Sequence, residues 1–348
     1  MKRLSAIVVA CCLTFSSGCD SPSSGSGPGG DGLYVLNEGA YGQNNAEITF
    51  YSFSDGRVGM NMFSTVNPTQ TLGDVANFIA EGGRELFIVV NNSNKIEIVD
   101  RASLASTGTI FLDASPRQMV VVSPDKAYVS NMDSTVSVID VFLRRAGKKI
   151  TVGAYPEGVI ASNGKLYVAV GGFGAGNTVQ VIDIATDAIV RTIAVSDGPA
   201  YFAVRSDGKL LLSCTGYQDF QNPANDTDGA LLVIDPETDA VLDLLVVPGH
   251  PSKVVVGPDD VAYMIGSGSF SGGPIWKIDA RTLAVTSESF IDGAFYGVGV
   301  DPLTFDVFVA DAKGFSTNGT VGIYSRTGQK RSEFVAGVGP SWILVYRE

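Results

Sequence analysis

The sequence predicts an all-β fold, a seven-bladed β-propeller closed by pairing of N-terminal and C-terminal strands. Two observations lead to this prediction: short apolar runs recur in groups of four, and the groups repeat at a nearly constant interval. Equivalent positions at the start of each group are separated by 42, 40, 43, 52, 43 and 46 residues: Asp74, Pro116, Pro156, Pro199, Pro251, Ala294 and Pro340. Four short strands per period of this length are typical of a propeller blade.

The two ends of the chain supply the parts of one further blade. Six complete units, each with strands A to D, run from Asp74 to about Ala336. The segment from Leu33 to about Thr65 contains strands B, C and D, and "PSWILVY" from Pro340 supplies a strand A with nothing after it. Pairing of these two pieces would complete a seventh blade and leave no open sheet edge.

The first 32 residues are expected to lie outside the propeller, which spans residues 33–348. Residues 1–19 have the charged start, apolar run and small-residue cleavage site of an export signal, and "SSGC" ending at Cys19 resembles a bacterial lipoprotein signal. The alternative is an ordinary secretory signal. Residues 20–32 are rich in Ser, Gly and Pro and are expected to form a flexible tether. We therefore expect an exported lipoprotein, lipidated at Cys19, of the outer membrane and the cell surface.

Composition excludes several functional classes. With 24 basic and 36 acidic residues, the chain has a net charge of −12, which is poorly suited to nucleic acid. A single histidine, His250, excludes a multi-histidine zinc site, and a Ser/His/Asp triad would depend on this one loop residue. Residues 224–235 partly resemble a calcium loop, with Asp226 and Asp228, but Ala224 stands at the first ligand position. We expect a non-enzymatic protein without a cofactor or metal.

An aspartate at the end of strand C recurs in five units: Asp100, Asp140, Asp183, Asp235 and Asp279. Because these residues occupy the same position in successive blades, they lie apart and do not form a catalytic carboxylate pair. A carboxylate at this position can accept hydrogen bonds from the backbone N–H groups of the following turn. The repeated aspartates are therefore predicted to be structural.

The two faces of the propeller are predicted to differ. The A–B and C–D turns on one face are short and charged, and Asp187 is among their solvated residues. The B–C and D–A loops on the other face are unequal in length and rich in Asn, Gly and aromatic residues. One of them, "GGFGAGN" at 171–177, joins two strands and so is not a phosphate-binding loop, which would precede a helix. We expect it to present Phe173 on a binding face.

One repeat position suggests aromatic residues at the mouth of the channel. This position lies two residues beyond the start of each unit. The seven units carry there Ala76, Gln118, Gly158, Tyr201, Lys253, Tyr296 and Trp342. The alternative is that the aromatic residues plug the channel or pack between blades. The predicted ligand-binding residues of this face are Tyr41, Asn44, Asn45, Tyr155, Phe173, Tyr201, Tyr217, Phe220, His250, Phe270, Tyr296, Phe315 and Trp342.

Two stretches, "YVSNMDSTVSVID" at 128–140 and "LYVAVGGFGAGNTVQVIDIATDAIVRTIAV" at 166–195, resemble YVTN-type seven-bladed propellers. "LYVLNEGAYGQNNAEITFYS" at 33–52 resembles the opening of surface-exposed propeller lipoproteins that capture cobalamin and pass it to a TonB-dependent outer-membrane transporter. The resemblance implies a corrinoid ligand on the loop-rich face, and Tyr41, Asn44 and Asn45 fall inside the matching motif. Two alternatives are a scaffold propeller that binds another protein and a lactonase-like hydrolase.

Overall fold

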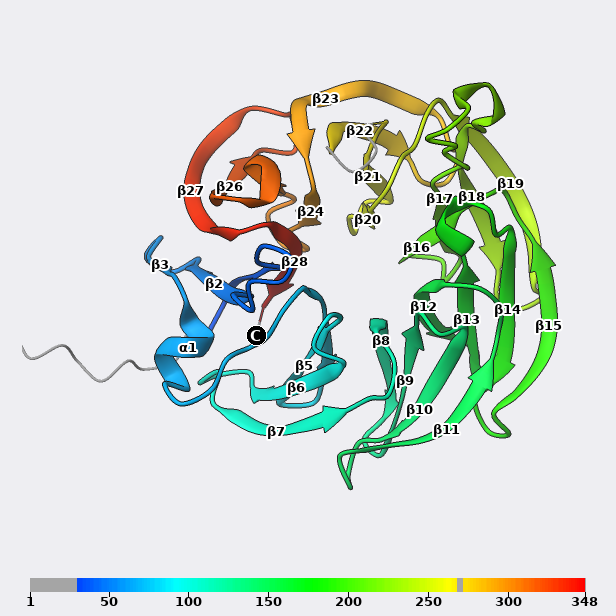
Figure 1. Cartoon of the computed structure of the whole chain (residues 1–348). Helices are drawn as coiled ribbons and strands as arrows, with labels where there is room; N and C mark the ends of the chain where they lie inside the picture. The colour runs from blue at the N-terminus through cyan, green and yellow to red at the C-terminus, as the bar shows by residue number, and fades with distance from the viewer. Residues whose placement is uncertain (1–29, 268–271, 348) are drawn as a thin grey trace, which may run out of the picture.

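The computed structural model describes residues 30–267 and 272–347, and it confirms the seven-bladed propeller. Seven four-stranded antiparallel sheets are arranged in a ring (Figure 1). We number as blades 1 to 6 the sheets β4–β7, β8–β11, β12–β15, β16–β19, β20–β23 and β24–β27, and as blade 7 the sheet of order β28-β1-β2-β3. The first strand of each complete blade is therefore innermost, and the fourth lies at the rim.

The strand bounds follow the predicted repeat closely. Blades 1 to 3 contain β4 (Ala76–Gly82), β5 (Glu85–Val90), β6 (Lys95–Asp100), β7 (Ser106–Phe111), β8 (Pro116–Ser123), β9 (Lys126–Asn131), β10 (Thr135–Asp140), β11 (Arg145–Thr151), β12 (Pro156–Ser162), β13 (Lys165–Val170), β14 (Thr178–Asp183) and β15 (Ala188–Ala194). Blades 4 to 6 contain β16 (Pro199–Val204), β17 (Leu210–Cys214), β18 (Gly229–Asp235), β19 (Ala240–Val247), β20 (Val254–Val256), β21 (Val261–Ile265), β22 (Gly273–Asp279), β23 (Val285–Phe295), β24 (Gly297–Val300), β25 (Val307–Asp311), β26 (Asn318–Tyr324) and β27 (Lys330–Val338).

Blade 7 closes the ring by joining the two ends of the chain, as the sequence predicts. It contains β28 (Pro340–Tyr346), β1 (Gly32–Asn37), β2 (Glu47–Ser52) and β3 (Val58–Gly59). Strands β28 and β1 pair antiparallel, with Leu36 opposite Trp342 and Gly32 opposite Tyr346. Arg347 beyond β28 forms ion pairs with Asp301 and Asp31, so side chains reinforce the closure.

The rim of blade 7 differs from the prediction. Its fourth strand, β3, is only two residues long, and the helix α1 (Met62–Val66) follows where a strand was expected to reach Thr65. Asn61 before the helix is left-handed, with φ 52°, which ends the extended run. Phe63, a residue of this helix, is completely buried, so packing of its side chain overrides strand formation. No helix among the described residues is long and apolar enough to span a bilayer.

The hydrophobic core is divided into clusters between neighbouring blades. Tyr167 and Val181 of blade 3, for example, belong to one cluster with Leu212 and Leu232 of blade 4. Alternation along each strand places its apolar side chains between the sheets, and burial of each large one stabilises the fold by about 1.5–3 kcal/mol.

The repeated aspartates have the predicted structural role. In each case a carboxylate oxygen accepts a hydrogen bond from a backbone N–H of the turn after strand C. The donors and distances are Ser103 to Asp100 (2.9 Å), Leu143 to Asp140 (2.8 Å), Thr186 to Asp183 (2.8 Å), Glu237 to Asp235 (2.9 Å) and Thr282 to Asp279 (2.9 Å). An aspartate that recurs at the same position in successive units thus has a structural role within each blade.

Candidate functional site

The B–C and D–A loops of neighbouring blades are held to one another by backbone hydrogen bonds. Gly198 in a D–A loop donates to the carbonyl of Gly176 in a B–C loop at 2.7 Å, and accepts from Thr215 of the next blade at 2.7 Å. Gly216 donates to the carbonyl of Asp197 at 2.9 Å. These bonds fix the loops relative to the sheets, so the face they form is organised before any ligand arrives.

Charged side chains at the starts of two inner strands meet near the axis of the propeller. Arg117 lies at the start of β8 and Glu157 at the start of β12, in adjacent blades. Both Nε and Nη2 of Arg117 lie 2.8 Å from Oε2 of Glu157. Burial alone would lower the pKa of Arg117, but the Glu157 carboxylate outweighs it and raises that pKa. The side chains of Arg117 and Glu157 retain 25% and 16% exposure, so the pair is accessible from solvent.

Lys253, next to this pair, is buried against two aromatic rings. Its Nζ lies 4.0 Å from the ring centroid of Tyr296 and 5.9 Å from that of Tyr201, and it donates a 2.8 Å hydrogen bond to the carbonyl of Tyr296. Burial lowers the pKa of Lys253 to about 8, although the charge of Glu38 opposes the shift. The ammonium is stabilised by the faces of the rings.

Glu38 supplies the second carboxylate of this group. It follows β1, and its backbone N–H donates to the carbonyl of Gly339 at 2.9 Å, so the closure of blade 7 places it near the axis. Burial raises the pKa of Glu38, although Lys253 and Ser341 both act to lower it. The charge of Glu38 in turn raises the pKa of Tyr296.

We call Glu38, Arg117, Glu157, Tyr201, Lys253 and Tyr296 the axial cluster. It combines two carboxylates, two cations and two phenol rings in a partly desolvated setting. Small-molecule sites typically combine aromatic surface with a few convergent polar groups of this kind.

Of the predicted aromatic residues, Tyr201 and Tyr296 are brought together in the axial cluster, and Phe315 packs edge-on against Tyr296 with ring centroids 4.8 Å apart. Trp342 instead packs against Phe78, at 4.4 Å, and against the core between blades 7 and 1. Trp342 therefore packs between blades, as the alternative hypothesis for the aromatic residues predicts.

Tyr155 and Phe173 form a separate aromatic pair on the loops of blade 3. Their ring centroids are 4.1 Å apart, and both residues have left-handed backbones, with φ 47° and 55°. Phe173 is 58% exposed, in agreement with the expectation that residues 171–177 present it to solvent.

Tyr217 and Phe220 lie on the long B–C loop of blade 4, between β17 and β18, and His250 lies on the D–A loop that follows β19. His250 Nδ1 lies 3.0 Å from the carbonyl oxygen of Thr215, and Nε2 lies 3.6 Å from Oδ2 of Asp226. Asp226 also accepts the backbone N–H of Asp219 at 2.7 Å, so its carboxylate holds the loop together. No group of three or more His, Cys, Asp or Glu side chains suited to a metal occurs in residues 30–267 and 272–347.

The remaining predicted residues lie elsewhere. Tyr41 is 79% exposed on the loop before β2. Asn44 and Asn45 line a pocket between blades 6 and 7. Phe270 lies outside the described residues.

Sequence reasoning missed the charged members of the axial cluster. Lys253 shares its repeat position with Tyr201, Tyr296 and Trp342, but only these aromatic residues were predicted to bind a ligand. Arg117 and Glu157 occupy the preceding position, where the other five units carry the uncharged residues Val75, Ala200, Ser252, Phe295 and Ser341. Two charged residues at a repeat position that is uncharged in the other five units were the signal that could have identified Arg117 and Glu157.

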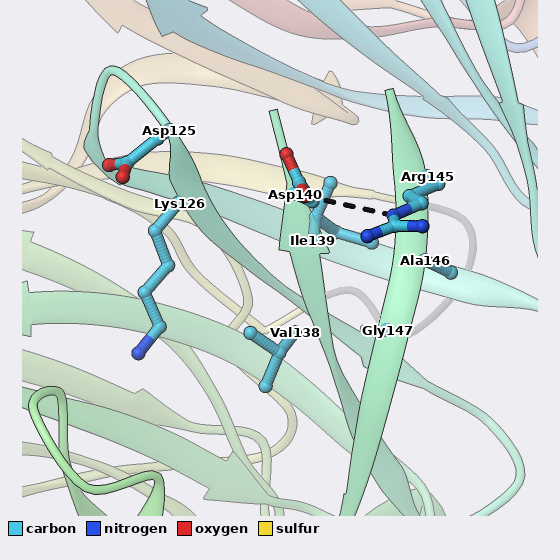
Figure 2. Close-up of a pocket in the computed structure, with 8 residues that line it drawn as sticks. All are labelled: Asp125, Lys126, Val138, Ile139, Asp140, Arg145, Ala146 and Gly147. Carbon is cyan, nitrogen blue, oxygen red and sulfur yellow. Dashed lines mark ion pairs between the residues drawn. The ribbon is translucent and has the colours of Figure 1, made fainter. Parts of the chain in front are cut away.

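The opposite face also has a pocket, in blade 2, with a volume of about 490 Å³ (Figure 2). It lies between the A–B turn at Asp125 and Lys126 and the C–D connection, where Arg145 is 3.7 Å from Asp140. Lys126 is paired with Asp187 of blade 3 at 2.8 Å. The two cations of this pocket, Lys126 and Arg145, are thus engaged in ion pairs that support the blades.

Solved structures share the fold. Hydrazine synthase from Kuenenia stuttgartiensis is 20% identical, with a TM-score of 0.59, over 77% of this chain and 88% of that one. A quinoprotein alcohol dehydrogenase-like protein from Bacteroides thetaiotaomicron is 14% identical, with a TM-score of 0.70, over 91% and 78%. The periplasmic gluconolactonase of Pseudomonas aeruginosa is 14% identical, with a TM-score of 0.66, over 90% and 99%. At these identities the likeness shows the fold alone.

No curated protein sequence matches the chain. A family model does match, over residues 31–334, which is nearly the whole propeller. The chain therefore belongs to the DUF5074 family, whose description is a domain of unknown function.

Proposed function

We propose that the protein is a non-enzymatic binding propeller of the bacterial envelope, which holds a bulky small molecule at the axial cluster. The position of Lys253 carries this proposal. Within the described residues it donates a single hydrogen bond, to the carbonyl of Tyr296, and an ammonium has three N–H donors. A buried cation with spare donors between two aromatic rings offers a ligand both hydrogen bonds and stacking surface.

The ligand class we propose is a corrinoid. Support comes from the resemblance of residues 33–52 to cobalamin-capturing propeller lipoproteins, and Glu38 of the axial cluster lies inside that stretch. A broad macrocycle with polar substituents suits a site with several rings and both signs of charge. The exposed pair of Tyr155 and Phe173, on the loops of blade 3, would offer further apolar contact at the edge of a large ligand.

The binding proposal is tested with the chain from Asp31 to Glu348, which retains all seven sheets. Cobalamin is mixed with this protein, and the two are separated by size exclusion. We expect the visible absorbance of the corrinoid to elute with the protein. Separate elution at micromolar protein would contradict the corrinoid proposal and leave the ligand of the axial cluster unidentified.

We also propose that Cys19 carries a lipid anchor in the outer membrane and that the captured molecule passes to a TonB-dependent transporter. Both parts rest on the sequence, since residues 1–29 lie outside the described structure. Cys19→Ala should move the protein from the membrane fraction to the soluble fraction. Continued fractionation with membranes would contradict the lipid anchor.

A lactonase-like hydrolase is the second candidate, and one feature of the axial cluster favours it. Burial raises the pKa of Glu38 and lowers that of Lys253 to about 8, and groups displaced in this way are common in acid–base catalysis. Hydrolysis of gluconolactone by the purified protein, abolished by Glu38→Gln, would favour the hydrolase over the binding protein.

A further inference from the structure

A second pocket lies at the seam where blade 7 meets blade 6, apart from the axial cluster. Its volume is about 320 Å³. It is lined by the loop before β2, helix α1, the segment before β4, the start of β26 and the end of β27. Segments from both ends of the chain therefore meet in it only because the propeller is closed.

Four of the eleven residues that line this seam pocket are exposed asparagines. Asn44, Asn45, Asn61 and Asn318 all contribute. Within the described part of the chain, the side chains of Asn44, Asn61 and Asn318 make no hydrogen bond, while Oδ1 of Asn45 accepts the N–H of Ala40 at 2.9 Å. Since a primary amide both donates and accepts, three unpaired amides offer a bound group donors and acceptors together.

The charges and apolar groups of the seam pocket restrict what it can bind. Among the described residues that line it, Glu47 is the one charged side chain, and none is lysine, arginine or aromatic. A phosphate or carboxylate would meet no free cation there, because Lys95, which donates to the carbonyl of Thr71 at 3.3 Å, is paired with Glu97 at 2.9 Å. A planar ring would find no aromatic residue in the lining to stack on. Oε1 of Glu47 accepts the N–H of Ser64 at 3.3 Å and has capacity for a further donor. Leu72 and Val338 supply a small apolar surface.

The walls of the seam pocket are fixed by contacts outside it. The helix is held by fully buried Phe63 and by Asn67, whose Nδ2 donates to the carbonyl of Leu104 at 2.9 Å. Ala46 donates its N–H to the carbonyl of Gly73 at 3.0 Å. Asn44 and Asn61 both have left-handed backbones, with φ 55° and 52°, which asparagine adopts more readily than most residues. The amides are therefore displayed by ordered backbone.

We propose that the seam pocket binds one neutral saccharide unit. Sugar hydroxyls both donate and accept, which matches the amides, and one hydroxyl can donate to Glu47. The volume stands at the lower end of the roughly 300–1,000 Å³ of small-molecule pockets, as befits a single sugar ring. This inference goes beyond the proposed function, because the saccharide site and the axial cluster share no residue.

The test is saturation-transfer NMR of the chain from Asp31 with glucose, galactose, mannose and N-acetylglucosamine. Each sugar is titrated to about 20 mM, well above the ~1 mM Kd expected of a small neutral ligand. At least one sugar should bind, and Asn44→Gly with Asn318→Ala should weaken it at least tenfold. Glycine at 44 removes the amide while keeping the left-handed backbone. The matched control is Asn222→Ala, an exposed asparagine on another loop.

Binding by none of the four sugars would overturn the proposal, and so would equal affinity of the double variant, because the sugar would then bind elsewhere. If the double variant fails to fold, Asn61→Gly replaces it, and the side-chain amide resonances of the wild-type asparagines are followed during the titration. These should shift for Asn44, Asn61 and Asn318 but not for Asn222. Tyr296→Ala should leave sugar binding unchanged, which separates this result from that of the axial cluster.

Discussion

The hydroxyl of Tyr167 donates a 2.5 Å hydrogen bond to Oδ1 of Asp239, which lies 72 residues later in the C–D turn of the next blade. Tyr128 makes the same contact with Asp187 of its neighbour, also at 2.5 Å, and Tyr34 donates to the carbonyl of Arg101 at 2.9 Å. These tyrosines occupy equivalent positions on strand B. The face with the short turns is thus tied from blade to blade, and Asp187, predicted to be merely solvated, is one of the ties.

We predict that Tyr167→Phe destabilises the propeller by about 1–3 kcal/mol, because the almost buried carboxylate of Asp239 loses a donor and keeps, among the described side chains, only Lys165, at 2.8 Å. The measurement is the free energy of unfolding in urea. Tyr263→Phe is the matched control, since this buried tyrosine of blade 5 makes no hydrogen bond to a described residue. Equal losses for the two variants would contradict the role of the hydroxyl.

Removal of residues 340–348 should abolish cooperative unfolding. It takes away β28, which pairs with β1 from Gly32 to Asn37, and with it the ion pairs of Arg347. The remaining strands of blade 7 would expose an unpaired edge, so we also expect aggregation. The measurement is thermal unfolding followed by circular dichroism. A truncated protein that melts at the temperature of the parent would disprove closure by β28.

Lys253 should make stability depend on pH in the alkaline range. Its pKa falls from 10.5 to about 8 on folding, so between these values the unfolded chain binds more protons and the free energy of unfolding rises with pH. This pKa shift corresponds to at most about 3 kcal/mol in the free energy of unfolding. That stability is fully present above pH 10.5 and is lost as the pH falls through about 8.

The check compares wild type with Lys253→Met by urea unfolding at several pH values. The difference in free energy between the two proteins should change in favour of wild type as the pH rises from 7 to 10. A difference that is constant across this range would show that Lys253 is not desolvated as described.

The fold could be predicted from the sequence because each blade repeats the same local pattern. Pro116, Pro156, Pro199 and Pro340 each begin an inner strand, as the repeat implies. The prediction was wrong near Thr65, where the fourth strand of blade 7 is only two residues long and helix α1 follows it. Burial of Phe63 there depends on contacts with other strands, which a local pattern does not reveal.

The candidate site was predictable only in part. Loop composition identified the face, and the repeat identified Tyr201 and Tyr296. Glu38 could not be found in this way, because its position near Lys253 results from the meeting of the two chain ends in blade 7. Asn44 and Asn45 were assigned to the same face, but which pocket they line depends on the packing of α1 against β2.

The most direct test of the binding role is a calorimetric titration of the chain from Asp31 with cobalamin, for wild type, Tyr296→Ala and Arg145→Ala. Tyr296 contacts Lys253 in the axial cluster, whereas Arg145 lies in the pocket of the opposite face. We predict that Tyr296→Ala weakens binding at least tenfold, about 1.4 kcal/mol, and that Arg145→Ala leaves the Kd unchanged. Equal Kd values for wild type and Tyr296→Ala would contradict the claim that the ligand is held at the axial cluster.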